Sequence, residues 1–206
     1  MAHGFDSILN ASTVPPCQIV CSRYYCWVSD AHRLLERISA LFRAQLRRVS
    51  TDHGLKLVQL EALVYLDAAN RYSDTPLALA EYLALTKGTV SQTLKTLESS
   101  GLLTKTPDDD DRRVQHCAVT ADGAAIVADA LRIPMDAGDP GLQSALRSVL
   151  RSLQHTADAR TFGVCNSCIH HQDEGGRARC GLTGEALRKA DRVKICREHE
   201  PVPIRT

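Results

Sequence analysis

The residues with the most evident chemistry in this chain are four cysteines close to its end. Two residues separate Cys165 from Cys168, eleven separate Cys168 from Cys180, and fifteen separate Cys180 from Cys196. Four thiolates are a complete ligand set for one zinc ion or for an iron–sulfur cluster. The spacing therefore predicts one metal centre held by these four cysteines.

Zinc and an iron–sulfur cluster both stay open as occupants of this centre. Zinc ribbons usually pair two Cys-x2-Cys knuckles, whereas only the first pair here has that spacing, and the compact cysteine run of a ferredoxin is also absent. We place zinc ahead, because a tail with few large apolar residues needs the folding free energy that structural zinc supplies. We expect the nearby His170, His171 and His199 to be exposed to solvent, although each could replace a ligand or hydrogen-bond to one.

Another group of cysteines lies near the start of the chain, at Cys17, Cys21 and Cys26. The first two would lie one helical turn apart if the segment were helical. This group could be redox-active or could bind a metal with a fourth partner, and a plain N-terminal arm packed on a dimer is an equal alternative. Cys117 is expected to be a small core residue, since free cysteine is commonly buried.

Length and composition limit the classes of protein to consider. The chain has 206 residues, 44% hydrophobic and only 4% aromatic, with a net charge of +1. Such a core must consist mainly of Leu, Val, Ile and Ala, which favours helices, and any DNA-binding surface must be a local patch. No segment resembles a secretory signal or a membrane span, so we expect a cytoplasmic protein, in which cysteines favour metal or redox chemistry over disulfides.

The apolar periodicity, the capping residues and the turn signals predict a mainly helical order of elements. Two short helices are expected to be joined by a tight turn, and two strands are expected to form a hairpin with a polar tip. The expected elements are helices over Ser29–Val49, Leu57–Ala69, Thr75–Leu85 and Lys87–Ser100, strands over Leu102–Thr106 and Val114–Val119, and helices over Thr120–Leu131 and Leu142–Leu153.

The helix that begins at Lys87 has a polar side suited to the major groove of DNA. Val90, Leu94 and Leu97 share its other side. Gln can pair with adenine, Lys can reach guanine or phosphate, and the helix N-terminus attracts phosphate. The candidate DNA-binding residues of this helix are Thr86, Lys87, Thr89, Ser91, Gln92 and Lys95.

Three sequence blocks give this region a resemblance to the MarR family of winged-helix regulators. They are Leu85-Thr86-Lys87-Gly88-Thr89-Val90-Ser91-Gln92, then Leu97-Glu98-Ser99-Ser100-Gly101-Leu102-Leu103, and Asp111-Arg112-Arg113 followed by Thr120 and Gly123. The resemblance extends from about Ala31 to Leu153. It implies a recognition helix, a β-wing and terminal helices that pair two subunits.

The resemblance also implies roles for the hairpin tip. Arg113 should enter the minor groove of DNA with Asp111 holding it in position, and Arg112 is a further candidate DNA contact. Two departures stand out. Four consecutive aspartates, Asp108 to Asp111, occupy a wing that usually carries fewer acids, so they would repel phosphate unless they point away, and Val119 replaces a common leucine.

The expected fold is mainly α with a small β-wing, followed by a small four-cysteine, metal-bound module. The expected domains are an N-terminal arm over residues 1–28, a winged-helix DNA-binding and dimerisation domain over 29–158, and a cysteine-rich module over 159–206. A homodimer is expected because the MarR family pairs its terminal helices and because a two-fold dimer matches a palindromic site.

The function expected from these features is that of a transcriptional regulator, acting as a repressor on a palindromic operator in double-stranded DNA. The resemblance implies either a small-molecule inducer or thiol oxidation as the signal, and the sequence leaves the choice open. One alternative is an iron–sulfur or redox sensor in which the cluster gates DNA binding, and another is an adaptor that binds protein rather than DNA. An enzyme is not expected, because four thiolates leave a metal no open position and no nucleophile-base arrangement is evident.

Overall fold

The computed structural model describes residues 30–109, 111–132, 139–156 and 160–202. Cys17, Cys21 and Cys26 lie outside the described residues, so their roles stay predictions. The chain divides into two units, residues 1–41 and 42–206, each considered by itself. In the first unit, the described residues form the beginning of helix α1 (Asp30–Asp52), where Leu34, Ile38 and Leu41 are exposed.

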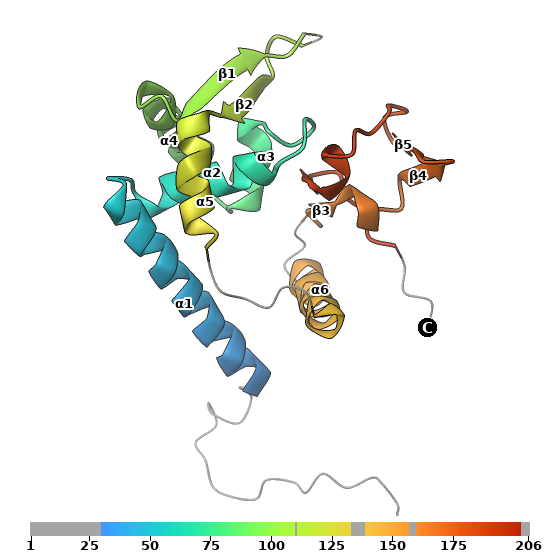
Figure 1. The fold of residues 1–206 in the computed structure, drawn as a ribbon, viewed down its shortest axis with the longest axis horizontal. Helices are drawn as coiled ribbons and strands as arrows, with labels where there is room; N and C mark the ends of the chain where they lie inside the picture. Colours follow the sequence, from blue (N-terminus) through green and yellow to red (C-terminus); the bar gives the residue numbers. More distant parts are fainter. Residues whose placement is uncertain (1–29, 110, 133–138, 157–159, 203–206) are drawn as a thin grey trace, which may run out of the picture. The chain divides into compact units, whose positions relative to one another are not determined.

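The second unit holds the predicted series of helices and the predicted hairpin (Figure 1). After the end of α1, the elements are α2 (Leu57–Ala68), α3 (Pro76–Tyr82), α4 (Lys87–Ser99), β1 (Leu103–Pro107), β2 (Gln115–Val119), α5 (Ala121–Ala130) and α6 (Pro140–Thr156). β1 and β2 pair antiparallel, from Leu103 opposite Val119 to Pro107 opposite Gln115. The mainly helical fold with a small β-hairpin is thereby confirmed.

Three threonines fix the starts of the short helices. Thr75, Thr86 and Thr120 each precede a helix and accept a hydrogen bond from the backbone N–H three residues later. These bonds satisfy N–H groups that have no partner within the helix. α3 ends at Tyr82, earlier than the predicted stop near Leu85, because Ala84 adopts a positive φ of 51° that a helix cannot continue through.

The core of the winged-helix part lies where α2, α3 and α4 meet the hairpin. Leu63, Leu79 and Leu97 are fully buried there. Cys117 of β2 joins them at 1% exposure, so its prediction as a core residue is confirmed. The hairpin is thus held through the side chains of its buried face rather than by its two strands alone.

A close backbone approach explains the glycine at the start of α5. A Cβ atom on Gly123 would lie 2.5 Å from the carbonyl oxygen of Leu102 and 2.7 Å from Val119. Any larger residue would push α5 away from the base of the hairpin. Gly123 therefore lets α5 pack directly against the base of the hairpin, where β1 begins and β2 ends.

The C-terminal segment consists of short strands and 3-10 turns. β3 (Gly163–Val164) pairs antiparallel with β6 (Ile195–Cys196), and β4 (His171–Glu174) pairs antiparallel with β5 (Arg177–Cys180). The single-turn 3-10 helices η1 (Cys165–Ser167) and η2 (Asp191–Val193) lie between them. This segment carries all four of the C-terminal cysteines.

The C-terminal segment packs on the winged-helix part. Phe162 and Ile195 lie against the main core, and the Phe162 ring meets Tyr65 and Tyr82 edge-to-face with ring centres 6.2 and 5.1 Å apart. The few large apolar residues of the tail predict that it can hardly fold by burial alone. The structure shows that the tail gains burial by sharing the core of the neighbouring helices, while the domain boundaries themselves stay a prediction.

α6, like the beginning of α1, carries apolar side chains that are exposed among the described residues. α6 has no buried residue, and its exposed leucines, Leu142, Leu146, Leu150 and Leu153, recur at three- and four-residue spacing. Such a stripe is typical of a helix that packs against another element. No helix among the described residues has the length and apolar character needed to cross a membrane.

Candidate nucleic-acid interface and cysteine cavity

α4 has one buried apolar side and one exposed polar side, as its sequence predicts. Val90, Leu94 and Leu97 are buried at 1% exposure or less, and they pack the helix on the core. The opposite side offers the candidate DNA-binding residues, all exposed: Thr86, Lys87, Thr89, Ser91, Gln92 and Lys95. No acidic side chain lies on this part of α4 before Glu98. The helix therefore presents donors and two positive charges with no negative charge among them.

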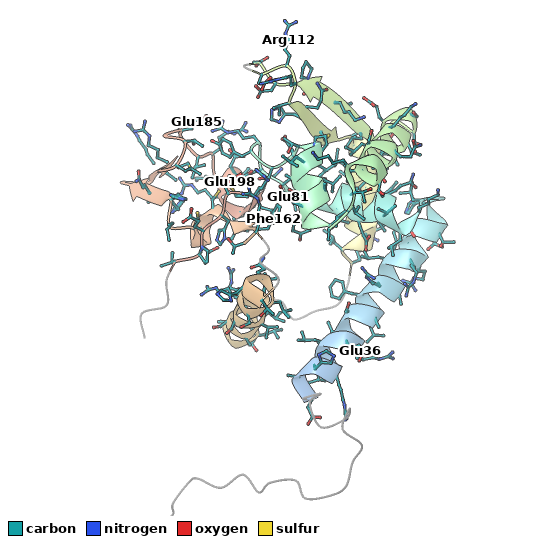
Figure 2. The ribbon with its side chains drawn as sticks, turned by 180° about the vertical axis from the view of Figure 1, so that it is seen from behind. Glu36, Glu81, Arg112, Phe162, Glu185 and Glu198 are labelled. Atoms are coloured by element: carbon teal, nitrogen blue, oxygen red, sulfur yellow. The ribbon has the colours of Figure 1, made fainter. Side chains whose placement is uncertain are left out.

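The wing tip holds one arginine in a fixed orientation. Asp111 accepts two hydrogen bonds from the Arg113 side chain, with Oδ1–Nε and Oδ2–Nη2 distances of 2.9 Å each. The pair raises the pKa of Arg113 and lowers that of Asp111. Arg113 is otherwise exposed, and Figure 2 shows Arg112 projecting from the tip of the hairpin. The contacts of both arginines with DNA stay predictions.

The aspartates of the wing are partly used inside the protein. Asp108 lies 3.0 Å from Nε2 of His116, and Asp74, from the loop before α3, lies 2.6 Å from Nδ1 of the same ring. Both carboxylates raise the pKa of His116, and burial raises the pKa of Asp74. Asp108 thus helps to tie the wing to the helix-turn-helix through His116, and Asp111 holds Arg113. These contacts pair two of the four consecutive aspartates with positively charged or protonatable side chains, so their repulsion of phosphate is reduced.

A groove lies between α3, α4 and the hairpin. Its volume is about 680 Å³, and its lining includes Lys87, Ser91, Lys105 and Arg113. Three of these four side chains are cationic, but Lys105 is paired with Glu98 and Arg113 with Asp111, and the lining also includes the apolar Leu77, Val90 and Val114. The groove thus connects the polar side of α4 with the wing, and the cationic side chains along it suit the phosphate backbone of a nucleic acid.

The helix-turn-helix followed by a hairpin resembles a known protein family. Residues 53–114 match the model of the MarR family. The matched range begins just after α1 and ends in the wing, so it contains α4, Asp111 and Arg113. MarR proteins are transcription regulators and not enzymes, which agrees with the expectation for this chain. No curated protein sequence matched the chain.

Several solved structures also match the chain. A MepR mutant from S. aureus bound to an oligodeoxyribonucleotide is 22% identical, with 61% of this chain and 99% of that chain covered and a TM-score of 0.42. Transcriptional regulator Tm0710 from Thermotoga maritima is 26% identical, covering 62% and 94%, with a TM-score of 0.43. CouR from Rhodococcus jostii RHA1 bound to p-coumaroyl-CoA is 22% identical, covering 63% and 92%, with a TM-score of 0.48. Because these scores lie below 0.5, the winged-helix assignment rests on the elements and on the family match.

The four C-terminal cysteines line one cavity. The cavity has a volume of about 70 Å³ and is lined by Cys165, Cys168, Cys180 and Cys196. Tyr72 of the loop between α2 and α3 and further side chains of the tail complete its walls. The Cys165 thiol hydrogen-bonds to Cys196, which lowers the pKa of Cys196 and raises that of Cys165. All four cysteines are free thiols.

The predicted metal centre has no direct support in this arrangement. Among the residues that the structure describes, no three or more His, Cys, Asp or Glu side chains are placed as a site for one metal ion. A metal at these cysteines, zinc included, therefore stays a prediction. His199 is buried at 8% exposure, contrary to the expected solvent exposure, because its ring nitrogens bond to the carbonyl oxygens of Thr161 and Ser167.

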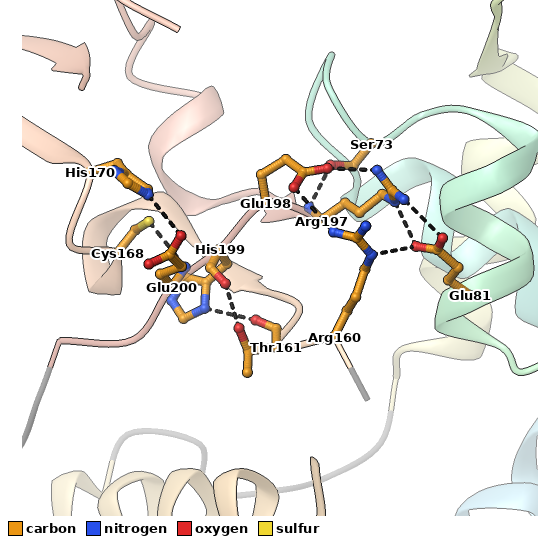
Figure 3. A network of polar contacts seen from close by, with 10 residues as sticks. All are labelled: Ser73, Glu81, Arg160, Thr161, Cys168, His170, Arg197, Glu198, His199 and Glu200. Atoms are coloured by element: carbon orange, nitrogen blue, oxygen red, sulfur yellow. Dashed lines mark hydrogen bonds and ion pairs between the residues drawn. The ribbon is translucent and has the colours of Figure 1, made fainter. Parts of the chain in front are cut away.

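Polar contacts join the cysteine segment to the loop between α2 and α3 (Figure 3). Ser73 Oγ accepts a hydrogen bond from the backbone N–H of Arg197 at 2.8 Å. The Arg197 side chain bonds to both carboxylate oxygens of Glu81 on α3, at 2.6 and 2.8 Å, and Arg160 reaches the same carboxylate at 3.1 Å. The sequence reasoning missed these residues, because no local signal marks partners that are 116 positions apart.

Proposed function

We propose that this protein is a MarR-type transcriptional regulator that binds operator DNA as a homodimer and acts as a repressor. The observation that carries the proposal is the exposed, acid-free side of α4, set opposite a fully buried side in a helix-turn-helix whose residues match the MarR family. In a helix-turn-helix protein the second helix enters the major groove, and α4 is that helix here.

Residue chemistry supports a division of labour on the DNA. Gln92 is suited to read adenine through two hydrogen bonds, and Lys87 and Lys95 are suited to guanine or phosphate. Arg113, held by Asp111, is suited to a narrow minor groove. The palindromic operator follows from the two-fold symmetry of a dimer.

The homodimer is supported by apolar surface left uncovered within the chain. The leucine stripe of α6 runs from Leu142 to Leu153, and α1 carries Leu34, Ile38 and Leu41 exposed at similar spacing. Isolated exposed leucines are common on soluble proteins, but aligned stripes mark interaction surfaces. Another copy of the same two helices would cover both stripes.

A small-molecule inducer is part of the proposal. A cavity of about 710 Å³ lies among α3, α6 and the tail, lined by Tyr82, Leu150, Arg160 and Phe162. The aromatic walls suit a flat, largely apolar ligand, because the Arg160 guanidinium is already paired with Glu81 and Glu198. CouR, to which the chain is similar, is described as bound to p-coumaroyl-CoA.

The test starts by selecting operator sequences from a random duplex library with the full-length protein. Affinity for the selected duplex is then measured by fluorescence anisotropy for the native chain, Gln92→Ala and Lys95→Ala. We expect Gln92→Ala to lose about tenfold in affinity and to relax the preference at one base pair, and Lys95→Ala to weaken binding while reducing its salt dependence.

A matched control is Lys189→Ala, which removes the same charge from an exposed site in the tail. It should bind like the native chain. If all three variants bind alike, α4 does not read the DNA. Weak binding with no salt dependence would instead favour the adaptor alternative.

A further inference from the structure

The four-cysteine cavity has room for a group larger than a single ion, because its volume of about 70 Å³ exceeds the roughly 15 Å³ that one water-sized particle occupies. Four sulfurs bound to one zinc ion at roughly 2.3 Å lie about 3.8 Å from one another. Cys165 and Cys196 are close enough to share a hydrogen bond. Among the described residues, however, no group of three or more ligands is placed around a single ion. All four thiols nevertheless converge on the same space of about 70 Å³. The thiols thus surround a volume rather than a point.

The surroundings of the cavity suit a bound group with sulfur ligands. Leu187 and Ala178 are buried beside Cys165 and Cys196, with Tyr72 and Cys180 packed against them. Two N–H groups point at the thiols: Asn70 Nδ2 lies 3.7 Å from Cys165 Sγ, and the backbone N–H of Glu200 lies 3.4 Å from Cys168 Sγ. An apolar wall and N–H donors to sulfur are the features by which proteins hold and tune iron–sulfur clusters.

We propose that Cys165, Cys168, Cys180 and Cys196 bind an iron–sulfur cluster in this cavity, and that the cluster stabilises the DNA-binding conformation of the helix-turn-helix. A cluster places several irons and sulfides between its thiolates, so it occupies a cavity of this kind more fully than a single ion does. The cluster is taken up preformed. Each thiol releases its proton to solvent as its sulfur bonds to an iron, and the protein neither gains nor loses an electron.

The link to α3 runs through the loop between α2 and α3. Asn70 is buried at 1% exposure; besides reaching Cys165, it donates its backbone N–H to the carbonyl oxygen of Ile195, next to Cys196, at 2.9 Å. On the other side of Cys196, Arg197 bonds to Ser73 and Glu81. Cys165 and the residues on both sides of Cys196 are therefore anchored on the loop between α2 and α3 or on α3 itself.

This part of the proposal rests on the proposed function, since it assigns a regulator to the DNA-binding surface. α3 packs against α4, and its position sets that of the recognition helix. Loss of the cluster would release the anchored loop and leave α3 and α4 free to shift. We expect the cluster-free protein to bind the operator about tenfold more weakly, which is an ordinary coupling between two sites.

The test uses full-length protein produced in iron-supplied cells and isolated without oxygen. Iron, zinc and acid-labile sulfide are measured per chain together with the absorption spectrum. Operator affinity is measured before and after removal of iron with a chelator. We expect iron and sulfide in the native chain, their loss in Cys180→Ser, and their retention in a triple variant, Cys17→Ser, Cys21→Ser and Cys26→Ser.

The outcomes separate the two claims. Zinc without sulfide, or no metal, would overturn the cluster, as would loss of iron only in the triple variant. Iron and sulfide with equal operator affinity before and after chelation would overturn the regulatory link. Glu81→Gln should keep the cluster, but its operator affinity should change less on chelation than that of the native chain. Absence of operator binding in both states would overturn the proposed function, while the metal analysis would still decide the site.

Discussion

Arg197 and Glu81 form a two-bond ion pair that joins the cysteine segment to the first helix of the helix-turn-helix. The two distances, Nε–Oε2 at 2.6 Å and Nη2–Oε1 at 2.8 Å, are those of a guanidinium matched to a carboxylate. Because Arg197 follows Cys196 directly, any rearrangement at the cysteine cavity acts on α3 through this pair. The tail is in this way tied directly to the helix-turn-helix.

Glu81→Gln should lower the free energy of unfolding by about 1 kcal/mol, a figure already reduced for solvent screening. The pair lowers the pKa of Glu81, so its contribution is present above the ordinary glutamate pKa and is lost as pH falls through the lowered value. Urea unfolding at neutral and acidic pH measures both effects. Glu98→Gln is the control, since Glu98 makes only a single-bond pair with Lys105, at 2.8 Å. Equal losses in the two variants would contradict the prediction.

His116→Asn should remove a pH dependence of stability. Asp108 and Asp74 raise the pKa of His116, so the folded state binds the proton more tightly than the unfolded chain does. The stabilisation is complete below the ordinary histidine pKa of about 6.5 and is lost as pH rises through the raised value. As pH rises from below about 6.5 through the raised pKa, the melting temperature should therefore fall more for the native chain than for His116→Asn. His155→Asn, on the exposed side of α6, should follow the native curve; parallel curves for all three proteins would refute the assignment.

Asp111→Asn should weaken operator binding without affecting thermal stability. The substitution weakens the hold on Arg113 at an exposed site where no packing is lost. Arg113→Ala should cost about tenfold in affinity, the usual worth of one charged contact with DNA, and Asp111→Asn should cost less. Asp109→Asn changes the same charge at an exposed neighbour and is the control. Tighter binding by Asp111→Asn would mean that its charge repels phosphate rather than positioning Arg113.

Leu146→Asp should turn the dimer into a monomer. Leu146 lies in the middle of the exposed leucine stripe of α6, and a buried carboxylate without a partner cannot be accommodated in an apolar interface. Light scattering coupled to gel filtration gives the mass. Ser148→Asp adds the same charge to the same helix outside the leucine stripe and should remain dimeric. A monomeric native chain would contradict the prediction at the outset.

Much of the fold could be predicted because its signals are local. The threonine caps, the leucine spacing of α4 and the turn at Gly101 each act within a few residues, and they give the order and nearly the bounds of the elements. The amphipathic character of α4 also follows from sequence alone. The overestimated end of α3 shows the limit, since the positive φ of Ala84 has no residue signal such as glycine.

The docking of the tail could not be predicted, because its contacts join distant residues. Phe162 meets Tyr65 and Tyr82, and Arg197 meets Glu81, through packing that no periodicity encodes. The few large apolar residues of the tail predict that it needs the folding free energy of a metal, because the sequence does not show the core that the tail shares with the helices. Its four cysteines share one cavity, as their spacing suggests, but the identity of any occupant depends on distances that spacing does not determine.

The most direct test of the account is a hydroxyl-radical footprint of the full-length protein on its selected operator. A dimer that inserts two copies of α4 into the major groove should protect two half-sites related by a two-fold axis, with centres about one helical turn apart or a multiple of it. Protection of a single half-site would contradict the dimer, and no protection at low salt would contradict the assignment of α4 as a DNA-recognition helix.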